Sequence, residues 1–319
     1  MNLLRIAAAV ILTTAVTAST TESARATGRY AHAHLRVELL ARFDQAANQP
    51  AEGLARTPDG SLYVSFKPLQ QVVQVHPDGS HTVVATLPGH ATGMGGLVGL
   101  TATPDGRILG ALANGDPRYN GIWAVRPGGK AHRLAALPAD AVPNDLVLAP
   151  DGQSVLVSES GGGTIYRISL SDGRMTTWLH DPLLQPPIGA AIPIGVNGIT
   201  FRSPTELVAV NSAAGSVISV PIRRDGSAGT PGKIGEADFP DGVRALRGRL
   251  YITQPVDNRV IRISPSGRTT VLANGEAGLD APVSILLGRH RRGVTEVIVT
   301  DSSVTDTGDR PGVTSLTLR

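Results

Sequence analysis

A sequence repeat constrains the fold of this chain more than any other feature, and each of its units opens with the first residues of an expected β-strand. The strand beginnings are separated by about 40 to 55 residues, which is the repeat length of propeller blades. Each is followed at once by a short apolar run. The spacing therefore predicts six repeated units. They begin at Glu52, Val98, Asn144, Asn197, Asp241 and Val283.

Each unit has the rhythm of a four-stranded antiparallel sheet. The first expected strand ends in a turn such as Thr57-Pro58-Asp59-Gly60. Proline fixes φ, aspartate bonds locally and glycine accepts a positive φ, so these residues favour a hairpin. In the first unit the next three strands are expected at 61–65, 72–75 and 82–87. No helical period persists over ten residues, which indicates an all-β fold.

The two ends of the chain complement each other. The sixth unit has only three expected strands before Arg319, and the segment Leu35–Phe43 can supply the fourth. Such closure removes the exposed sheet edge that invites aggregation. The sequence therefore predicts a six-bladed β-propeller with four-stranded antiparallel blades, closed by an N-terminal strand in the last blade. An open solenoid of β units is the alternative.

The length and composition are compatible with one domain at residues 27–319. A chain of 319 residues with 41% hydrophobic residues has enough apolar surface for a substantial core. Its 37 glycines and 23 prolines are spread along the expected turns, and no linker interrupts the repeats.

Residues 1–26 are typical of an export signal. Arg5 precedes the apolar run Ile6–Ala18, and Ala24-Arg25-Ala26 matches a cleavage site. The run is too short to span a membrane, so we expect a secreted or periplasmic protein without a membrane anchor after cleavage. An uncleaved anchor is the alternative. The chain has no cysteine, which excludes disulfides and thiolate metal sites.

The charge balance and the aromatic content argue against a nucleic-acid partner. The formal net charge is only +3, and the basic cluster Arg289–Arg292 falls in an expected hairpin tip, where a solvated loop is the simpler interpretation. Only 3% of residues are aromatic, so little material for base stacking is present. We expect a small-molecule substrate and favour a monomer.

Familiar cofactor and nucleophile motifs are missing. The stretch Gly93–Gly99 does not have the glycine spacing of a dinucleotide site, and we expect it to be a loop that leads into the second blade. No nucleophile elbow, zinc-protease helix or phosphate-binding loop is found. We expect His32 and His34 in a frayed N-terminal lead-in, with metal chelation on a strand face as the alternative, and His90, which precedes the glycine-rich stretch, could reach a central site.

Four oxygen-bearing side chains share one register of the repeat: Glu52, Asn144, Asn197 and Asp241. In a closed ring these strand beginnings converge on the axis. Two carboxylates and two amides are hard donors, which suit Ca²⁺ best, with Mg²⁺, Mn²⁺ and Zn²⁺ as alternatives. The competing interpretation is a set of turn residues around a channel, since Asn-Gly and Asp-Gly are turn dipeptides. By strand alternation, Asp145 is expected to point away and to be structural.

The ordered set Glu52-Gly53, Asn144-Asp145, Asn197-Gly198 and Asp241-Gly242, together with the Pro-Asp-Gly turns, resembles the senescence-marker-protein/gluconolactonase/regucalcin-like family of six-bladed propellers. The resemblance extends over nearly the whole chain after the signal. It implies a divalent metal held by Glu52, Asn197 and Asp241, with Asn144 near the metal and the substrate. It also implies lactone or ester hydrolysis.

The residues fit this chemistry. A cation on the axis would polarise a lactone carbonyl, and Asp241 is the candidate general base, while Glu52 is expected to remain a ligand. Asn144 would contact the substrate.

The expected substrate is fairly apolar. Asn144 follows Ala141-Val142-Pro143, where the sugar-lactone members of the family carry an arginine. The loop Asp181–Ile194 is almost wholly apolar, as either a packed cap or a lid over a hydrophobic ligand. Two other functions remain open: a non-hydrolytic cyclase, isomerase or lyase reaction, and a non-catalytic exported binding module.

Overall fold

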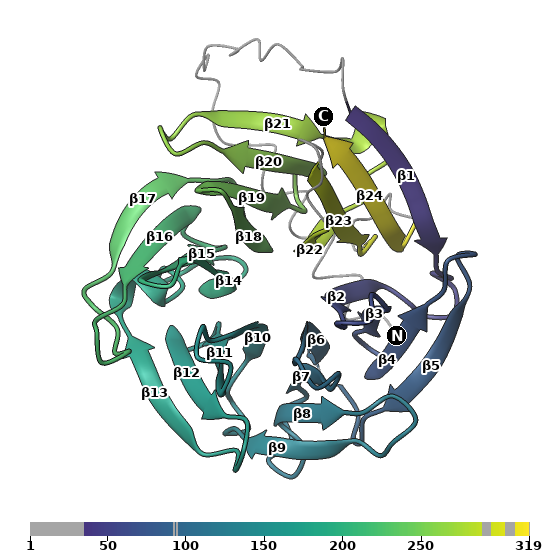
Figure 1. The fold of residues 1–319 in the computed structure, drawn as a ribbon, viewed down its shortest axis with the longest axis horizontal. Helices are drawn as coiled ribbons and strands as arrows, with labels where there is room; N and C mark the ends of the chain where they lie inside the picture. The colour runs from purple at the N-terminus through teal and green to yellow at the C-terminus, as the bar shows by residue number, and fades with distance from the viewer. Residues whose placement is uncertain (1–34, 92, 94, 289–294, 304–309, 319) are drawn as a thin grey trace.

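The computed structural model describes residues 35–318 except 92, 94, 289–294 and 304–309, and these residues form a six-bladed β-propeller. Six four-stranded antiparallel sheets surround a central axis (Figure 1). The predicted fold class is therefore confirmed. The predicted export signal at residues 1–26, His32, His34 and the basic cluster Arg289–Arg292 lie outside the described residues.

The first three blades contain strands β2 to β13. Their bounds are β2 Ala51–Arg56, β3 Leu62–Phe66, β4 Gln71–Val75 and β5 His81–Thr86; β6 Gly96–Ala102, β7 Ile108–Ala113, β8 Gly121–Val125 and β9 His132–Ala136; and β10 Pro143–Leu148, β11 Ser154–Glu159, β12 Thr164–Ser169 and β13 Met175–His180.

The last three blades contain strands β14 to β24 and strand β1. Their bounds are β14 Val196–Ser203, β15 Glu206–Asn211, β16 Ser216–Pro221 and β17 Gly232–Glu236; β18 Val243–Leu246, β19 Arg249–Gln254, β20 Arg259–Ile263 and β21 Thr269–Ala273; and β22 Pro282–Leu287, β23 Thr295–Asp301, β24 Gly312–Leu318 and β1 Leu35–Arg42. Two short 3-10 turns, η2 Pro182–Leu184 and η3 Gly275–Ala277, lie between blades.

Strand β1 closes the ring. It pairs antiparallel with β24, from Leu35 opposite Leu318 to Arg42 opposite Gly312. In Figure 1 this strand lies at the outer edge of the sheet formed by β22, β23 and β24. The open solenoid is therefore excluded.

The core lies between the blades. Six clusters of buried apolar side chains each join neighbouring sheets; one of them contains Phe43 and Leu54 together with Ile298 of the last blade. Burial of apolar surface between sheets is the main stabilising contribution in such a ring. It also fixes the inner strands at the axis.

The expectation that residues Gly93–Gly99 form a loop is wrong in part. Strand β6 begins at Gly96, where φ is +140°, a backbone conformation that favours glycine. Among the described residues, no helix has the length and hydropathy needed to cross a membrane.

Candidate functional site

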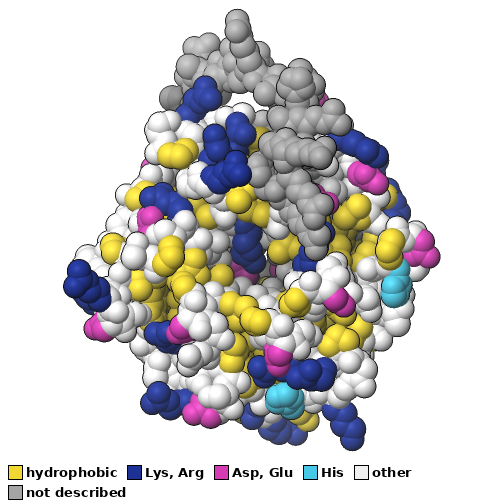
Figure 2. Space-filling view, in the orientation of Figure 1, with side chains coloured by type: hydrophobic (Ala, Val, Ile, Leu, Met, Phe, Trp, Pro, Cys, Tyr) yellow, Lys and Arg dark blue, Asp and Glu magenta, His cyan; other side chains and the backbone are white. Residues whose placement is uncertain are grey.

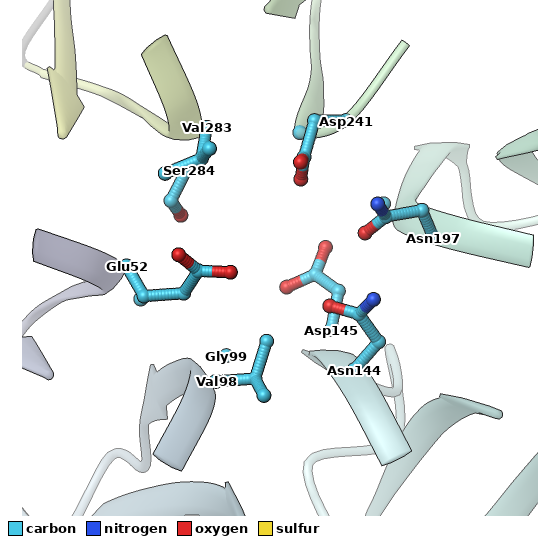
Figure 3. A pocket seen from close by; sticks show the side chains of 12 residues that line it. Glu52, Val98, Gly99, Asn144, Asp145, Asn197, Asp241, Val283 and Ser284 are labelled. Carbon is cyan, nitrogen blue, oxygen red and sulfur yellow. The ribbon is translucent and has the colours of Figure 1, made fainter. Parts of the chain in front are cut away.

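The four predicted oxygen-bearing side chains meet at the axis. Glu52, Asn144, Asn197 and Asp241 come from four different blades and line one cavity of about 20 Å³ (Figure 3). This volume suits a single ion or water. The roles predicted for these side chains, in metal binding and catalysis, remain predictions.

A repeated bulge aims three of these side chains, those of Glu52, Asn144 and Asn197, whereas Asp241 lies just before β18, which pairs with β19 without a bulge. In the first blade, Ala51 pairs with Phe66 and Leu54 pairs with Val64. The pairing thus advances by three residues along the inner strand and by two along its neighbour, which leaves one extra residue on the inner strand. The same irregularity recurs on β6, β10, β14 and β22 at the corresponding place. A bulge interrupts strict alternation and redirects side chains. Two consecutive residues of an inner strand therefore reach the cavity wall.

Asp145 shows the consequence of the bulge. The sequence predicted that it points away from the axis, but it lines the cavity next to Asn144 (Figure 3). That orientation was wrong because alternation does not hold across the bulge between Pro143 and Leu146.

The glycines of the motif are packing residues. A Cβ atom at Gly53 would lie 2.2 Å from the carbonyl oxygen of Val98, and one at Gly198 would lie 2.4 Å from that of Asp241. Neither glycine has a positive φ, so neither is there to allow a turn. The interpretation of the dipeptides as turn residues is therefore wrong: the glycines let neighbouring inner strands approach closely and keep the channel narrow.

Two serines orient the amides. Nδ2 of Asn144 donates to Oγ of Ser160 at 3.1 Å, and Nδ2 of Asn197 donates to Oγ of Ser212 at 3.0 Å. Because the nitrogens are directed to these hydroxyls, both amide oxygens face the cavity (Figure 3). Outer hydrogen bonds of this kind fix ligand orientation in metal sites.

Arg244 forms a buried ion pair with Asp145. Its Nη1 lies 2.8 Å from Oδ2 and its Nη2 lies 3.2 Å from Oδ1, and the two side chains are 15% and 11% exposed. Nη1 also donates to the carbonyl oxygen of Ile199, and Asp145 accepts the backbone N–H of Ile199. The pair joins blades three, four and five beside the cavity. The guanidinium of Arg244 thus balances the charge of Asp145, and the structural role expected for Asp145 stays a prediction.

Lys67 is a site residue that the sequence analysis missed. It follows β3, and its Nζ lies 3.0 Å from Oε1 of Glu52; the two side chains are 27% and 12% exposed. Burial alone would lower the pKa of Lys67, but the charge and hydrogen bond of Glu52 and the charge of Asp241 raise it. The ammonium is therefore part of the electrostatics of the site.

The pKa of Asp241 is raised well above its ordinary value. Burial is the main cause, and the charge of Glu52 adds to it; Lys67 acts in the opposite direction. Two carboxylates that face one small cavity disfavour each other's ionised form. A cation between them would relieve this repulsion.

The residues present fit a divalent cation. The described residues contain no cluster of three or more His, Cys, Asp or Glu side chains placed to hold a metal, so the candidate set depends on its two amides. Their oxygens are oriented toward the cavity and join two carboxylates there. This all-oxygen set is what Ca²⁺ prefers.

Apolar side chains are exposed in the segments that lead into the inner strands of blades three and four. Ile188 is fully exposed, Val142 is 40% exposed, and Leu184 at the base of the same loop as Ile188 is buried in the core of the fourth blade. The amide of Asn211 holds this loop by donating to the carbonyl oxygen of Gln185. The loop 181–194 is therefore a packed cap at its base and an exposed apolar surface at its tip.

No second constellation of comparable chemistry was found in the described part of the chain. A larger groove of about 480 Å³ lies between blades two and three, where Arg107 and Arg167 are paired with Asp105 and Asp151. Charged side chains of both signs are interspersed over the face in Figure 2, which is hollowed at its centre. His90 is exposed.

Comparisons with known proteins show the fold. No family model and no curated protein matches the chain. Among solved structures, a gluconolactonase from Xanthomonas campestris is similar, with a TM-score of 0.65, 15% identity and coverage of 89% of this chain and 90% of that one. The PQQ-bound aldose sugar dehydrogenase from Streptomyces coelicolor gives a TM-score of 0.64, 16% identity and coverage of 89% and 98%. Virginiamycin B lyase from Staphylococcus aureus gives 0.60, 15% identity and coverage of 89% and 100%. The fold is thus shared by propeller enzymes with different reactions.

Proposed function

We propose that this chain is an exported, metal-dependent hydrolase that opens a lactone or ester. The observation that carries the proposal is the convergence of Glu52, Asn144, Asn197 and Asp241 on one cavity, with both amide oxygens turned inward. A gluconolactonase has the same fold, which supports the choice of lactones as the first substrates to test.

Each of the four side chains has a role in this proposal. Glu52, Asn197 and Asp241 would hold the cation, and Ca²⁺ suits them best. Such a cation supplies polarisation of the substrate carbonyl and stabilisation of the negative charge that develops on its oxygen. Asn144 would lie near both the cation and the substrate.

Asp241 acts as the general base. Its carboxylate lines the cavity beside the predicted metal position, so it can accept a proton from a water held there. In this role Asp241 takes a proton from the attacking water and later returns it to the leaving alkoxide. Glu52 cannot take this role easily because Lys67 holds one of its oxygens.

The cavity dimensions limit how the substrate binds. A space of about 20 Å³ admits an ion but not a lactone ring. The ring would therefore lie outside the cavity with only its carbonyl directed inward, and the loop 181–194, which leads into inner strand β14, is the candidate contact for it. Exposed apolar side chains such as Ile188 and Val142 favour a substrate with an apolar body.

The test compares wild-type protein with Asp241→Asn in the presence of Ca²⁺. We expect hydrolysis of alkyl or aryl lactones by the wild type, a loss of at least about 100-fold in kcat for Asp241→Asn, and an unchanged circular dichroism spectrum. Faster hydrolysis of gluconolactone than of every apolar lactone tested would contradict the expected substrate class. Equal activity of the two proteins would contradict the role of Asp241.

Product analysis separates hydrolysis from other reactions. Incorporation of one ¹⁸O atom from labelled water into the product carboxylate is expected for hydrolysis. An unsaturated or rearranged product without label would instead indicate a lyase or isomerase reaction, as the name of virginiamycin B lyase suggests for a protein of this fold.

A further inference from the structure

Lys67 differs from its counterparts in other blades. The residue after the second strand is a serine in blades three, four and six: Ser160, Ser212 and Ser302. Each of these hydroxyls lies beside one of the four oxygen-bearing side chains. In the first blade a lysine takes this position and pairs with Glu52. A charge therefore stands where three other blades have a neutral hydroxyl, while blades two and five have Asn114 and Pro255.

The charge balance of the site depends on what else is bound. Without a metal, the ammonium of Lys67 neutralises Glu52 at 3.0 Å. With a divalent cation, the carboxylates of Glu52 and Asp241 balance the metal, so Lys67 adds one uncompensated positive charge. Arg244 does not add to this uncompensated positive charge, because Asp145 pairs with it. A partly buried, uncompensated cation is costly unless an anion joins it.

The ammonium of Lys67 is accessible to an anion that binds outside the axial cavity. Its side chain is 27% exposed, more than the 12% of Glu52, and it has several rotatable bonds and three donors. Glu52 lines the cavity and the ammonium of Lys67 lies 3.0 Å from its carboxylate, so a substrate that directs its carbonyl into the cavity would hold its ring substituents in the neighbourhood of this ammonium.

We propose that Lys67 makes the site selective for lactones or esters that carry a carboxylate next to the reacting carbonyl. The proposal rests on the proposed function, since it names the substrate class of the same site. The apolar loop 181–194 contacts the rest of such a substrate, which is then an acid with an apolar body. Lys67 binds the substrate, and Asp241 remains the base.

The first experiment uses a matched pair of five-membered lactones that bear either a carboxylate or a carboxamide on the ring. For the wild type with Ca²⁺, we expect kcat/KM to be about tenfold or more higher for the carboxylate, mainly through KM, because a hydrogen bond to a charged group is lost in the amide. Lys67→Met is expected to abolish this preference and Lys67→Arg to retain part of it. Lys233→Met removes an equal charge from the outer strand β17, where Lys233 pairs with Glu236, and is expected to keep the preference.

The second experiment is independent of turnover. Calorimetry measures Ca²⁺ binding with and without cyclopentanecarboxylate, which cannot be hydrolysed, and with cyclopentanecarboxamide as control. We expect the carboxylate to tighten Ca²⁺ binding in the wild type but not in Lys67→Met. In the absence of any organic acid, Lys67→Met is expected to bind Ca²⁺ more tightly than the wild type, because a repelling charge is gone.

The outcomes separate the two proposals. If no lactone is opened but the carboxylate tightens Ca²⁺ binding through Lys67, hydrolysis is wrong and the role of Lys67 holds. If the wild type opens both lactones equally well, or Lys67→Met keeps the preference, the role of Lys67 is wrong and hydrolysis holds. An absence of Ca²⁺ binding, or no effect of the carboxylate on it, overturns the role of Lys67.

Discussion

Removal of the guanidinium of Arg244 should destabilise the propeller by a predictable amount. Arg244→Met keeps an unbranched apolar side chain but leaves the carboxylate of Asp145, which is only 11% exposed, without its cation. Loss of one partner of a buried pair costs about 3–5 kcal/mol. Asp145 retains the backbone N–H groups of Leu146 and Ile199, so we expect the lower end, about 3 kcal/mol. For a domain of this size that lowers Tm by about 6 °C.

The assay is a double-mutant cycle in urea and thermal unfolding. Arg244→Met, Asp145→Asn and the double variant are compared, and the double variant is expected to recover more than half of the summed loss, since it removes both charges. Arg36→Met serves as control, because Arg36 and Glu38 form a surface pair that is 75% and 54% exposed. That control should change the free energy of unfolding by less than about 0.5 kcal/mol.

Two results would refute this reasoning. One is a loss for Arg244→Met no larger than that of the surface control. The other is strict additivity of the two losses in the double variant, which would mean that Arg244 and Asp145 do not stabilise each other.

Three further predictions concern backbone packing, the pH dependence of stability and the loop 181–194. Gly99→Ala places a Cβ atom 2.2 Å from the carbonyl oxygen of Asn144 and should lower the free energy of unfolding by about 3 kcal/mol or more, whereas Gly232→Ala, with nothing within 4 Å, should be neutral in the same urea titration. Burial raises the pKa of Asp301 from 3.8 to about 7, so between these pH values the folded chain holds a proton that the unfolded chain has released. The free energy of unfolding should therefore fall as the pH rises from 3.8 to about 7. Asp301→Asn should remove this contribution to the pH dependence. Ile188→Ser, at a fully exposed position, should leave Tm unchanged but raise KM for apolar lactones several-fold, and an unchanged KM would show that the loop does not contact the substrate.

The architecture could be predicted because its signals are local and repeated. Thr57-Pro58-Asp59-Gly60 and its relatives specify the same hairpin wherever they occur, and Gly60 has the expected positive φ. Closure of the ring followed from the strand missing at one end and the spare strand at the other. Convergence of Glu52 and its three partners then followed from the repeat register.

The rest of the site depends on features that a single sequence hides. Asp145 reaches the cavity only because a bulge interrupts alternation on β10, and nothing in the local sequence announces that bulge. Its partner Arg244 lies 99 residues away along the chain. Lys67 is different, because an alignment of the residue after each second strand shows a lysine where Ser160 and Ser212 stand in other blades. That comparison would have revealed it.

The most direct test of the metal site is a crystal structure of the protein soaked with Mn²⁺, recorded at the manganese absorption edge. We expect one anomalous peak on the propeller axis, within about 2.0–2.6 Å of oxygens from Glu52, Asn144, Asn197 and Asp241. A map without a peak at the axis, with the four side chains ordered and turned away from one another, would contradict the site.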